Sequence, residues 1–214
     1  MPTKLEALLD DLSASKTFHL EMGKRMAEAD EGRVFPLDLL AAAVLNRSIN
    51  LIPAFIQLIK SKNMIAAAPL LRLQLDNCIR FHGAWLVEEP HDFATAVMKG
   101  EHIGRLKDRN GKKMTDRYLL TCFKEEFPWI TNVYEQTCGY IHLSNAHISN
   151  IFIGSSTEDD KVREFKIGTG DNFPDDSLHE EAVEAFIAAT KAMFHYITGW
   201  IETKNGEQVG VANP

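Results

Sequence analysis

The chain has 214 residues, of which 45% are hydrophobic, 25% charged and 9% aromatic. These values are those of an ordinary globular protein, and they exclude the collagen-like, disordered and disulfide-rich scaffold classes. A chain of about 200 residues buries enough surface for one core, so we expect a single domain over residues 1–214 that folds without a metal or a disulfide.

The net charge of −7 is unevenly distributed along the chain. Residues 155–184 hold ten Asp and Glu against three Lys and Arg, which accounts for the whole deficit. Residues 99–117 are the opposite, with seven Lys and Arg against three acidic residues, but they lack interleaved aromatic side chains for base stacking. This pattern favours a solvated basic loop. It argues against general nucleic-acid coating and leaves room for one local phosphate contact.

Compartment and cofactor use are also constrained by the sequence. The three cysteines are far apart and follow no signal peptide, which predicts a reducing, cytoplasmic setting. The longest apolar stretch, residues 49–59, is interrupted by polar residues and is shorter than the roughly 20 residues that a bilayer requires, so no membrane span is predicted. No Gly-rich phosphate loop, His-Glu-x-x-His or Gly-x-Ser-x-Gly motif is present, and we expect no cofactor.

Hydrophobic spacing predicts helices in most of the chain. Residues 3–29 repeat apolar side chains every three or four positions, beginning with a capping box at Thr3. A second helix is expected over residues 37–60, either kinked or split by Pro53. The third, residues 64–87, is apolar around nearly its whole circumference, which predicts a central helix buried on most sides.

Four further helices are predicted, with the approximate bounds 90–100, 116–126, 128–149 and 177–203. Between the last two, β-type runs at 151–153 and 162–167 flank a polar turn, which predicts a β-hairpin embellishment within residues 150–170. The tail, residues 204–214, is expected to fray. The sequence therefore predicts an all-α, single-domain bundle of about seven helices with one β-hairpin inserted before the last helix.

Three charged residues stand out on the predicted central helix. Arg72, Asp76 and Arg80 lie four residues apart and so share one face. Apolar residues continue the same stripe, which predicts partial burial and a need for partners. One interpretation is an internal ion-pair ladder that fixes helix register. The other is a site for an anion or phosphate, because Arg presents a planar fork to phosphate oxygens.

The helix before the predicted hairpin carries two polar faces. His142 and Asn145 lie on one face, and Tyr140, Ser144 and His147 lie on the other. The two histidines are about 140° apart on a helical wheel, so they cannot share one small ligand. Either face could supply a general base with an Asn or Tyr to orient a substrate, or could pack inside the bundle.

Cysteine and histidine recur four residues apart, at Cys78 and His82 and again at Cys138 and His142. If these helices packed with those faces opposed, two thiolates and two imidazoles would match the ligands of tetrahedral zinc. Buried cysteines and chance pairs give the same spacing. No metal is therefore predicted, and the zinc site stays an alternative.

The run over residues 66–80 and the later Tyr140-Ile141-His142-Leu143-Ser144 with His147 resemble uncharacterised bacterial helical-bundle proteins. Those proteins in turn look like distant members of the HEPN (higher eukaryotes and prokaryotes nucleotide-binding) assemblage. The resemblance covers residues 37–150, and it implies a helical bundle that acts as a dimer. HEPN ribonucleases carry an Arg shortly followed by a His on a late helix. This sequence departs from that pattern, because no Arg is followed by a His at that spacing.

Two functions follow from these observations. The first is a non-enzymatic helical binding or regulatory module that forms a homodimer, acts in bacterial stress or defence, and binds a protein partner or a small anionic ligand. Its candidate ligand-binding residues are Arg72, Asp76, Arg80, Tyr140, Ser144 and Asn145. The second is a diverged HEPN-like endoribonuclease acting on RNA. Its candidate catalytic residues are a general base, His142 or His147, and a phosphate-stabilising Arg72 or Arg80.

Overall fold

The computed structural model describes residues 2–152 and 165–206 of the chain. Within these residues it contains eight α-helices, two short 3₁₀ turns and no extended strand. The predicted all-α class is therefore confirmed. The helices are α1 (Lys4–Glu28), α2 (Pro36–Lys60), α3 (Met64–Leu86), α4 (Pro90–Met98), α5 (Asp116–Phe123), α6 (Ile130–Ile141), α7 (Asn145–Ile151) and α8 (Ser177–Lys204), and the turns are η1 (Asp30–Gly32) and η2 (Ile103–Arg105).

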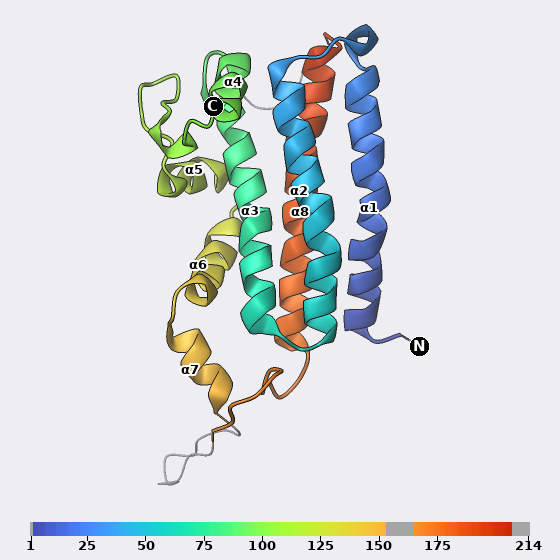
Figure 1. Cartoon of the computed structure of the whole chain (residues 1–214), viewed down its shortest axis with the longest axis vertical. Helices are drawn as coiled ribbons and strands as arrows, with labels where there is room; N and C mark the ends of the chain where they lie inside the picture. The colour runs from blue at the N-terminus through green and yellow to red at the C-terminus, as the bar shows by residue number, and fades with distance from the viewer. Residues whose placement is uncertain (1, 153–164, 207–214) are drawn as a thin grey trace.

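Four long helices, α1, α2, α3 and α8, form a bundle. α1 packs against α2 and α8, and α3 packs against the same two helices from the other side. Figure 1 shows α2 running opposite to α1, α3 and α8. Short loops join α1 to α2 and α2 to α3, so these neighbours are antiparallel. α8 is parallel to α3 because the chain between them returns to the end of the bundle where α3 begins.

The chain between α3 and α8 forms an outer arm, which consists of α4, α5, α6 and α7 (Figure 1). α4 packs against α2 and α3, while α5 and α6 pack along α3, and α7 follows α6. α3 thus contacts five other helices, and most of its residues are buried. This arrangement confirms the predicted central, buried helix.

Local sequence explains where the first helices begin. The Thr3 hydroxyl accepts a hydrogen bond from the Glu6 N–H at 3.2 Å, and the Glu6 carboxylate accepts one from the Thr3 N–H at 2.7 Å, which is the predicted capping box. Pro36 occupies the first turn of α2, where its missing N–H has no partner to lose. α2 continues through Pro53, which lies on its exposed side, so the alternative of a split helix is wrong.

Among the described residues, α2 is the one helix that is long and apolar enough to cross a membrane, with a mean hydropathy of 1.6. In this structure α2 packs against α1, α3 and α4, and Ile52, Phe55 and Ile59 on its inner face are completely buried. The Phe55 ring lies 4.5 Å from the Phe186 ring of α8. In total, 33% of the apolar window of α2 is buried inside the bundle. A core helix and a spanning helix can share this composition.

The single helix predicted over residues 128–149 is wrong, because the chain forms two helices there, α6 and α7. The Ser144 side chain donates a hydrogen bond to the Gly139 carbonyl at 2.6 Å and accepts one from the Ala146 N–H at 3.2 Å. Ser144 is therefore the N-cap of α7, and this local bonding competes with a continuous helix. The helix count is eight instead of seven, and His142 and His147 do not share a helical wheel.

The predicted β-hairpin is not found in the described part of the chain. Ile151, expected in the first strand, is the last residue of α7. The only pairing described there is an isolated antiparallel bridge between Phe152 and Phe165. The predicted turn and half of the second run, residues 162–164, fall within residues 153–164, which lie outside the described residues. Residues 207–214 of the predicted tail also lie outside them.

Candidate functional site

The charged face of α3 forms a cluster that extends beyond the three residues predicted from the sequence. Arg80 Nε donates to Asp76 Oδ1 at 2.6 Å, and Arg72 Nη1 lies 3.8 Å from the same oxygen. Arg47 reaches across from α2, and its Nη1 donates to Asp76 Oδ2 at 3.3 Å. Three guanidinium groups therefore surround one carboxylate.

A second carboxylate borders this group. Arg80 Nη2 donates to Asp116 Oδ1, at the start of α5, at 2.7 Å. We refer to Arg47, Arg72, Asp76, Arg80 and Asp116 as the arginine cluster. Its three cations and two anions leave one excess positive charge. The side chains of Arg72 and Asp76 are 13% and 16% exposed, whereas that of Arg47 is 41% exposed, so the cluster is open on its α2 side.

Burial and charge act in opposite directions on Arg80. Burial lowers the pKa of its guanidinium, but the hydrogen bond and charge of Asp76, together with the charge of Asp116, raise the pKa overall. Arg72 lies face-on to the Tyr134 ring of α6, with its Cζ atom 3.7 Å from the ring centroid. This stacking fixes the plane of the guanidinium group.

A chain of buried hydrogen bonds lies behind Arg47. Arg47 Nη1 donates to Asn77 Oδ1 at 3.0 Å, Asn77 Nδ2 donates to Gln74 Oε1 at 3.0 Å, and Gln74 Nε2 donates to Ser48 Oγ at 2.8 Å. Gln74 Nε2 also lies 3.1 Å from Thr190 Oγ1 on α8. Each amide thus has one orientation that satisfies its neighbours, and the Asn77 carbonyl is held towards Arg47.

The chain of hydrogen bonds ends at His19 of α1, which is buried. His19 Nε2 lies 2.8 Å from Ser48 Oγ, and its Nδ1 lies 2.8 Å from the Ser15 carbonyl. A carbonyl only accepts, so Nδ1 carries the proton and Nε2 accepts from Ser48. Burial lowers the pKa of His19, against a smaller opposing effect of the Ser15 carbonyl. We refer to His19, Ser48, Gln74, Asn77 and Thr190 as the buried polar network.

The structure divides the predicted site residues into two groups. Arg72, Asp76 and Arg80 come together in the arginine cluster. The ring centroids of Tyr140 and His147 lie 5.9 Å apart at the junction of α6 and α7, where His147 Nδ1 accepts the Ser144 N–H at 3.3 Å. Asn145 begins α7 and is exposed, as is His142 at the end of α6.

The predicted ribonuclease site requires a guanidinium and an imidazole at one place. Among the described residues, no hydrogen bond, ion pair or ring contact joins Arg72 or Arg80 to His142 or His147. The Nδ1 atom of His147 is moreover held in the capping box of α7. No direct contact in the described part of the chain therefore joins these arginines to these histidines.

The alternative zinc ligands are also separated. Cys78 is buried against α8, where its thiol lies 3.0 Å from the Ala189 carbonyl, and burial raises its pKa far above the ordinary thiol value. His82 packs against the rings of Phe123 and Tyr196, and burial lowers its pKa to about 4. In the described parts of the chain, no three His, Cys, Asp or Glu side chains are grouped as metal ligands, Cys138 and His142 included.

The basic loop has a structural role. Arg109 donates from its N–H to the Leu86 carbonyl at 2.9 Å, and its guanidinium also donates to the carbonyls of Trp85 and Leu86. A cation at this position satisfies the free carbonyls at the end of α3. Asp108 organises the rest of the loop, because it accepts hydrogen bonds from the Lys112 N–H at 2.7 Å and from the Tyr118 hydroxyl at 2.6 Å.

A buried acidic residue that the sequence analysis missed anchors the outer arm. Asp171 accepts hydrogen bonds from the Met64 N–H at 2.8 Å, from His179 Nε2 at 2.9 Å and from Asn150 Nδ2 at 3.0 Å. It therefore ties the starts of α3 and α8 to α7. The one signal in the sequence is an Asp that follows two glycines in the segment before α8, and this residue lies just outside the predicted hairpin, residues 150–170.

The arginine cluster thus combines excess positive charge, partial burial and a fixed geometry, and no other described cluster of charged side chains joins three cations. No family model matches the chain, and neither a curated protein nor a solved structure matches it. The resemblance to HEPN proteins accordingly stays a prediction, and the function has to be argued from the geometry of the site.

Proposed function

We propose that the protein is a helical binding module that holds a small anionic ligand, through phosphate or carboxylate oxygens, at the arginine cluster. The observation that carries this proposal is the imbalance of the cluster, in which three guanidinium groups share Asp76 and Asp116. Arg72 donates no hydrogen bond to any described residue, since its distance of 3.8 Å from Asp76 exceeds that of a hydrogen bond. Its planar fork is therefore available to oxygens of a ligand.

Arg47 supplies the second open group. Only its Nη1 atom is engaged, by Asp76 and Asn77, and the side chain is 41% exposed. A ligand that contacts Arg47 and Arg72 would neutralise the excess charge without displacing the bond between Arg80 and Asp116. A phosphate or carboxylate is favoured over a neutral ligand because charge-assisted hydrogen bonds are about twice as strong as neutral ones.

The buried polar network supports this function by holding Arg47 in place. A binding group that is fixed before the ligand arrives loses little conformational entropy on binding. Asn77 is fixed by Gln74, which is fixed in turn by Ser48 and Thr190. The stacking of Arg72 on Tyr134 has the same effect on the other cation.

The experiment is a calorimetric titration of the purified protein with inorganic pyrophosphate, together with the shift in Tm that pyrophosphate causes. We expect binding to the wild-type chain and a loss of roughly tenfold or more in affinity in Arg72→Gln, because a charge-assisted contact is removed. Arg117→Gln is the matched control, since Arg117 is exposed on α5 and its side chain forms no hydrogen bond or ion pair with the described residues.

Equal affinities of Arg72→Gln and Arg117→Gln would refute the proposal, because the binding would then depend only on general positive charge. Absence of any pyrophosphate binding, with a loss of stability in Arg72→Gln, would mean that the cluster is an ion-pair ladder that fixes the register of α3. Screening by salt provides a further check, since an ionic contact that includes the exposed guanidinium group of Arg47 weakens as ionic strength rises.

Homodimer formation and RNA cleavage remain predictions from the resemblance. Analytical ultracentrifugation of the full chain tests the first. RNA incubated with the purified protein, with His142→Ala as the control, tests the second. Cleavage that is lost in His142→Ala would favour the endoribonuclease over the binding module.

A further inference from the structure

A groove lies between α6 and α8, both of which pack against α3. Its cavity volume is about 340 Å³, within the range of small-molecule sites. Met64, Ala68 and Leu71 of α3 form its floor. None of these residues belongs to the arginine cluster, so the groove is a separate site.

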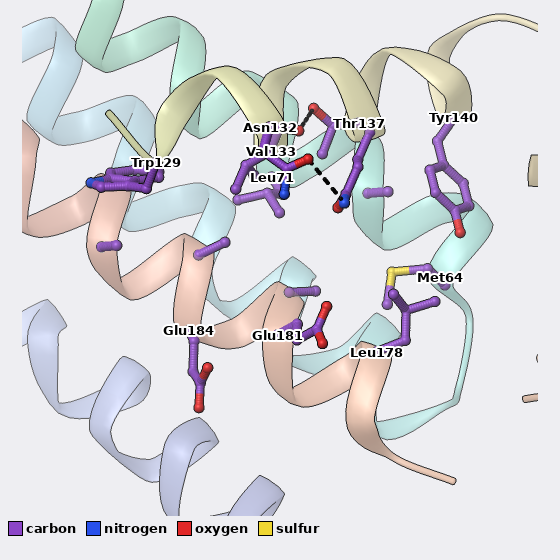
Figure 2. Close-up of a pocket in the computed structure, with 15 residues that line it drawn as sticks. Met64, Leu71, Trp129, Asn132, Val133, Thr137, Tyr140, Leu178, Glu181 and Glu184 are labelled. Atoms are coloured by element: carbon purple, nitrogen blue, oxygen red, sulfur yellow. Dashed lines mark hydrogen bonds between the residues drawn. The ribbon is translucent and has the colours of Figure 1, made fainter. Parts of the chain in front are cut away.

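The walls explain why the groove is open. α8 lines it with Ala182, Ala185 and Ala188, whose small side chains do not reach α6. Figure 2 shows Trp129, the N-cap of α6, and Tyr140 of α6 at opposite ends of the groove, with Leu71 and Val133 between them. The lining is mostly apolar, so it favours a ligand with an apolar body.

The charges along the groove are of one sign. The lining contains Glu181 and Glu184 but no Lys, Arg or His. Glu184 points away from α6 in Figure 2, and its carboxylate pairs with Lys4 of α1 at 2.9 Å. Glu181 forms no ion pair with any described residue and is exposed. One unpaired carboxylate therefore borders an apolar, aromatic-ended cavity.

We propose that this groove binds an organic cation with an apolar body of rings or alkyl chain. The apolar body would lie over the α3 floor, and the positive charge would lie next to Glu181. The faces of Trp129 and Tyr140 favour the same sign of charge, because an aromatic ring attracts a cation through its quadrupole. Charge complementarity thus selects a cation over an anion of equal shape.

The test uses two ions that have the same shape and opposite charge, tetraphenylphosphonium and tetraphenylborate. Each is titrated into the full chain while the fluorescence of Trp129 is followed, with Trp129→Phe identifying the contribution of this residue to the signal. We expect the cation to bind roughly tenfold more tightly than the borate. Glu181→Gln should reduce this preference by roughly fivefold, while Glu202→Gln, on α8 outside the groove, should leave it unchanged.

Three results would overturn the proposal. The first is that the borate binds as tightly as the cation, and the second is that Glu181→Gln leaves the preference unchanged. The third is binding of a cationic amphipathic helical peptide but not of the small cation, which would make the groove a protein-docking site. Glu181 is exposed, so its substitution tests the charge without disturbing the core.

Discussion

The two surfaces that border the packing of α6 on α3 differ in how their polar groups are satisfied. On one, Asp76 and Asp116 pair with most of the arginine cluster and Arg72 stacks on Tyr134, which leaves one excess positive charge. On the other, the groove has a cavity of about 340 Å³ and an unpaired carboxylate, Glu181. Ion pairs stabilise the first surface, whereas small side chains on α8 leave the second surface open.

Because of this difference, the two sites should respond to mutation in opposite ways. Removing a carboxylate from the arginine cluster should leave guanidinium groups without partners and so reduce stability. A larger side chain in the groove should fill open space and change the free energy of unfolding little, because the neighbouring atoms do not have to move. Stability and ligand binding are therefore coupled at the cluster and separable at the groove.

The largest effect is expected from Asp76→Ala, which removes the carboxylate shared by Arg47, Arg72 and Arg80. Breaking a partly buried ion pair by removing one partner costs about 3 kcal/mol or more. The free energy of unfolding, measured by urea denaturation, should fall by that amount, while Asp10→Ala on the exposed side of α1 serves as the control. A loss below about 1 kcal/mol would mean that water satisfies the arginines, as it does for surface pairs.

A comparably large loss of stability is expected at low pH, and it depends on a difference between the two buried histidines His19 and His82. His19 has partners for both ring nitrogens, whereas His82 Nδ1 has none. Burial lowers the pKa of His82 to about 4, against about 6.5 in the unfolded chain. The unfolded state thus takes up a proton first, and stability present above pH 6.5 is lost as the pH falls towards 4, by on the order of 3 kcal/mol.

His82→Leu checks this prediction, because it replaces the imidazole with an apolar side chain of similar size against Phe123 and Tyr196. Urea denaturation at neutral pH and at pH 5 should show a smaller loss of stability in His82→Leu than in the wild-type chain. His142→Gln, at an exposed position, is the control. If both variants lose as much stability between neutral pH and pH 5 as the wild-type chain, a group other than His82 must cause the loss in acid.

A smaller effect is expected from Gln74→Leu, which interrupts the buried polar network. The substitution leaves Asn77 Nδ2 without an acceptor and removes a donor from Ser48 and Thr190. Unsatisfied buried groups of this kind cost about 2 kcal/mol. Gln136→Leu in the groove is the matched control, since its amide makes only a 3.4 Å contact with Asn132. If Gln74→Leu and Gln136→Leu lowered the free energy of unfolding equally, the proposed difference between the two surfaces would be wrong.

The sequence predicted the helices of the bundle well because their apolar spacing is regular. It did not predict the break between α6 and α7, because the polar pattern continues across Ser144 and only the capping hydrogen bonds reveal the boundary. Arg72, Asp76 and Arg80 could be grouped in advance, because spacing on one helix fixes which residues are neighbours.

Residues from other elements could not be placed in the same way. Arg47 lies 29 residues before Asp76, and Asp116 lies 36 residues after Arg80, so these contacts depend on how α2 and α5 pack on α3. The groove was beyond sequence reasoning for the same reason, since its lining comes from α3, α6 and α8. Of its lining, only Tyr140 had been singled out, as a candidate ligand-binding residue.

The smallest effect is expected from Ala185→Leu, and it tests the groove most directly. Ala185 lines the groove, whereas Ala189, one turn further along α8, is completely buried beside Cys78. Ala189→Leu should overpack the core and cost about 1–3 kcal/mol, whereas Ala185→Leu should change the free energy of unfolding by less than about 1 kcal/mol.

Ala185→Leu should nevertheless abolish the binding of tetraphenylphosphonium, because the added side chain occupies the cavity. This combination, a folded protein of nearly unchanged stability that has lost the cation, distinguishes a ligand groove from a packing defect. If Ala185→Leu destabilised the protein as much as Ala189→Leu, the groove would have no free space and the contrast between the two surfaces would fail.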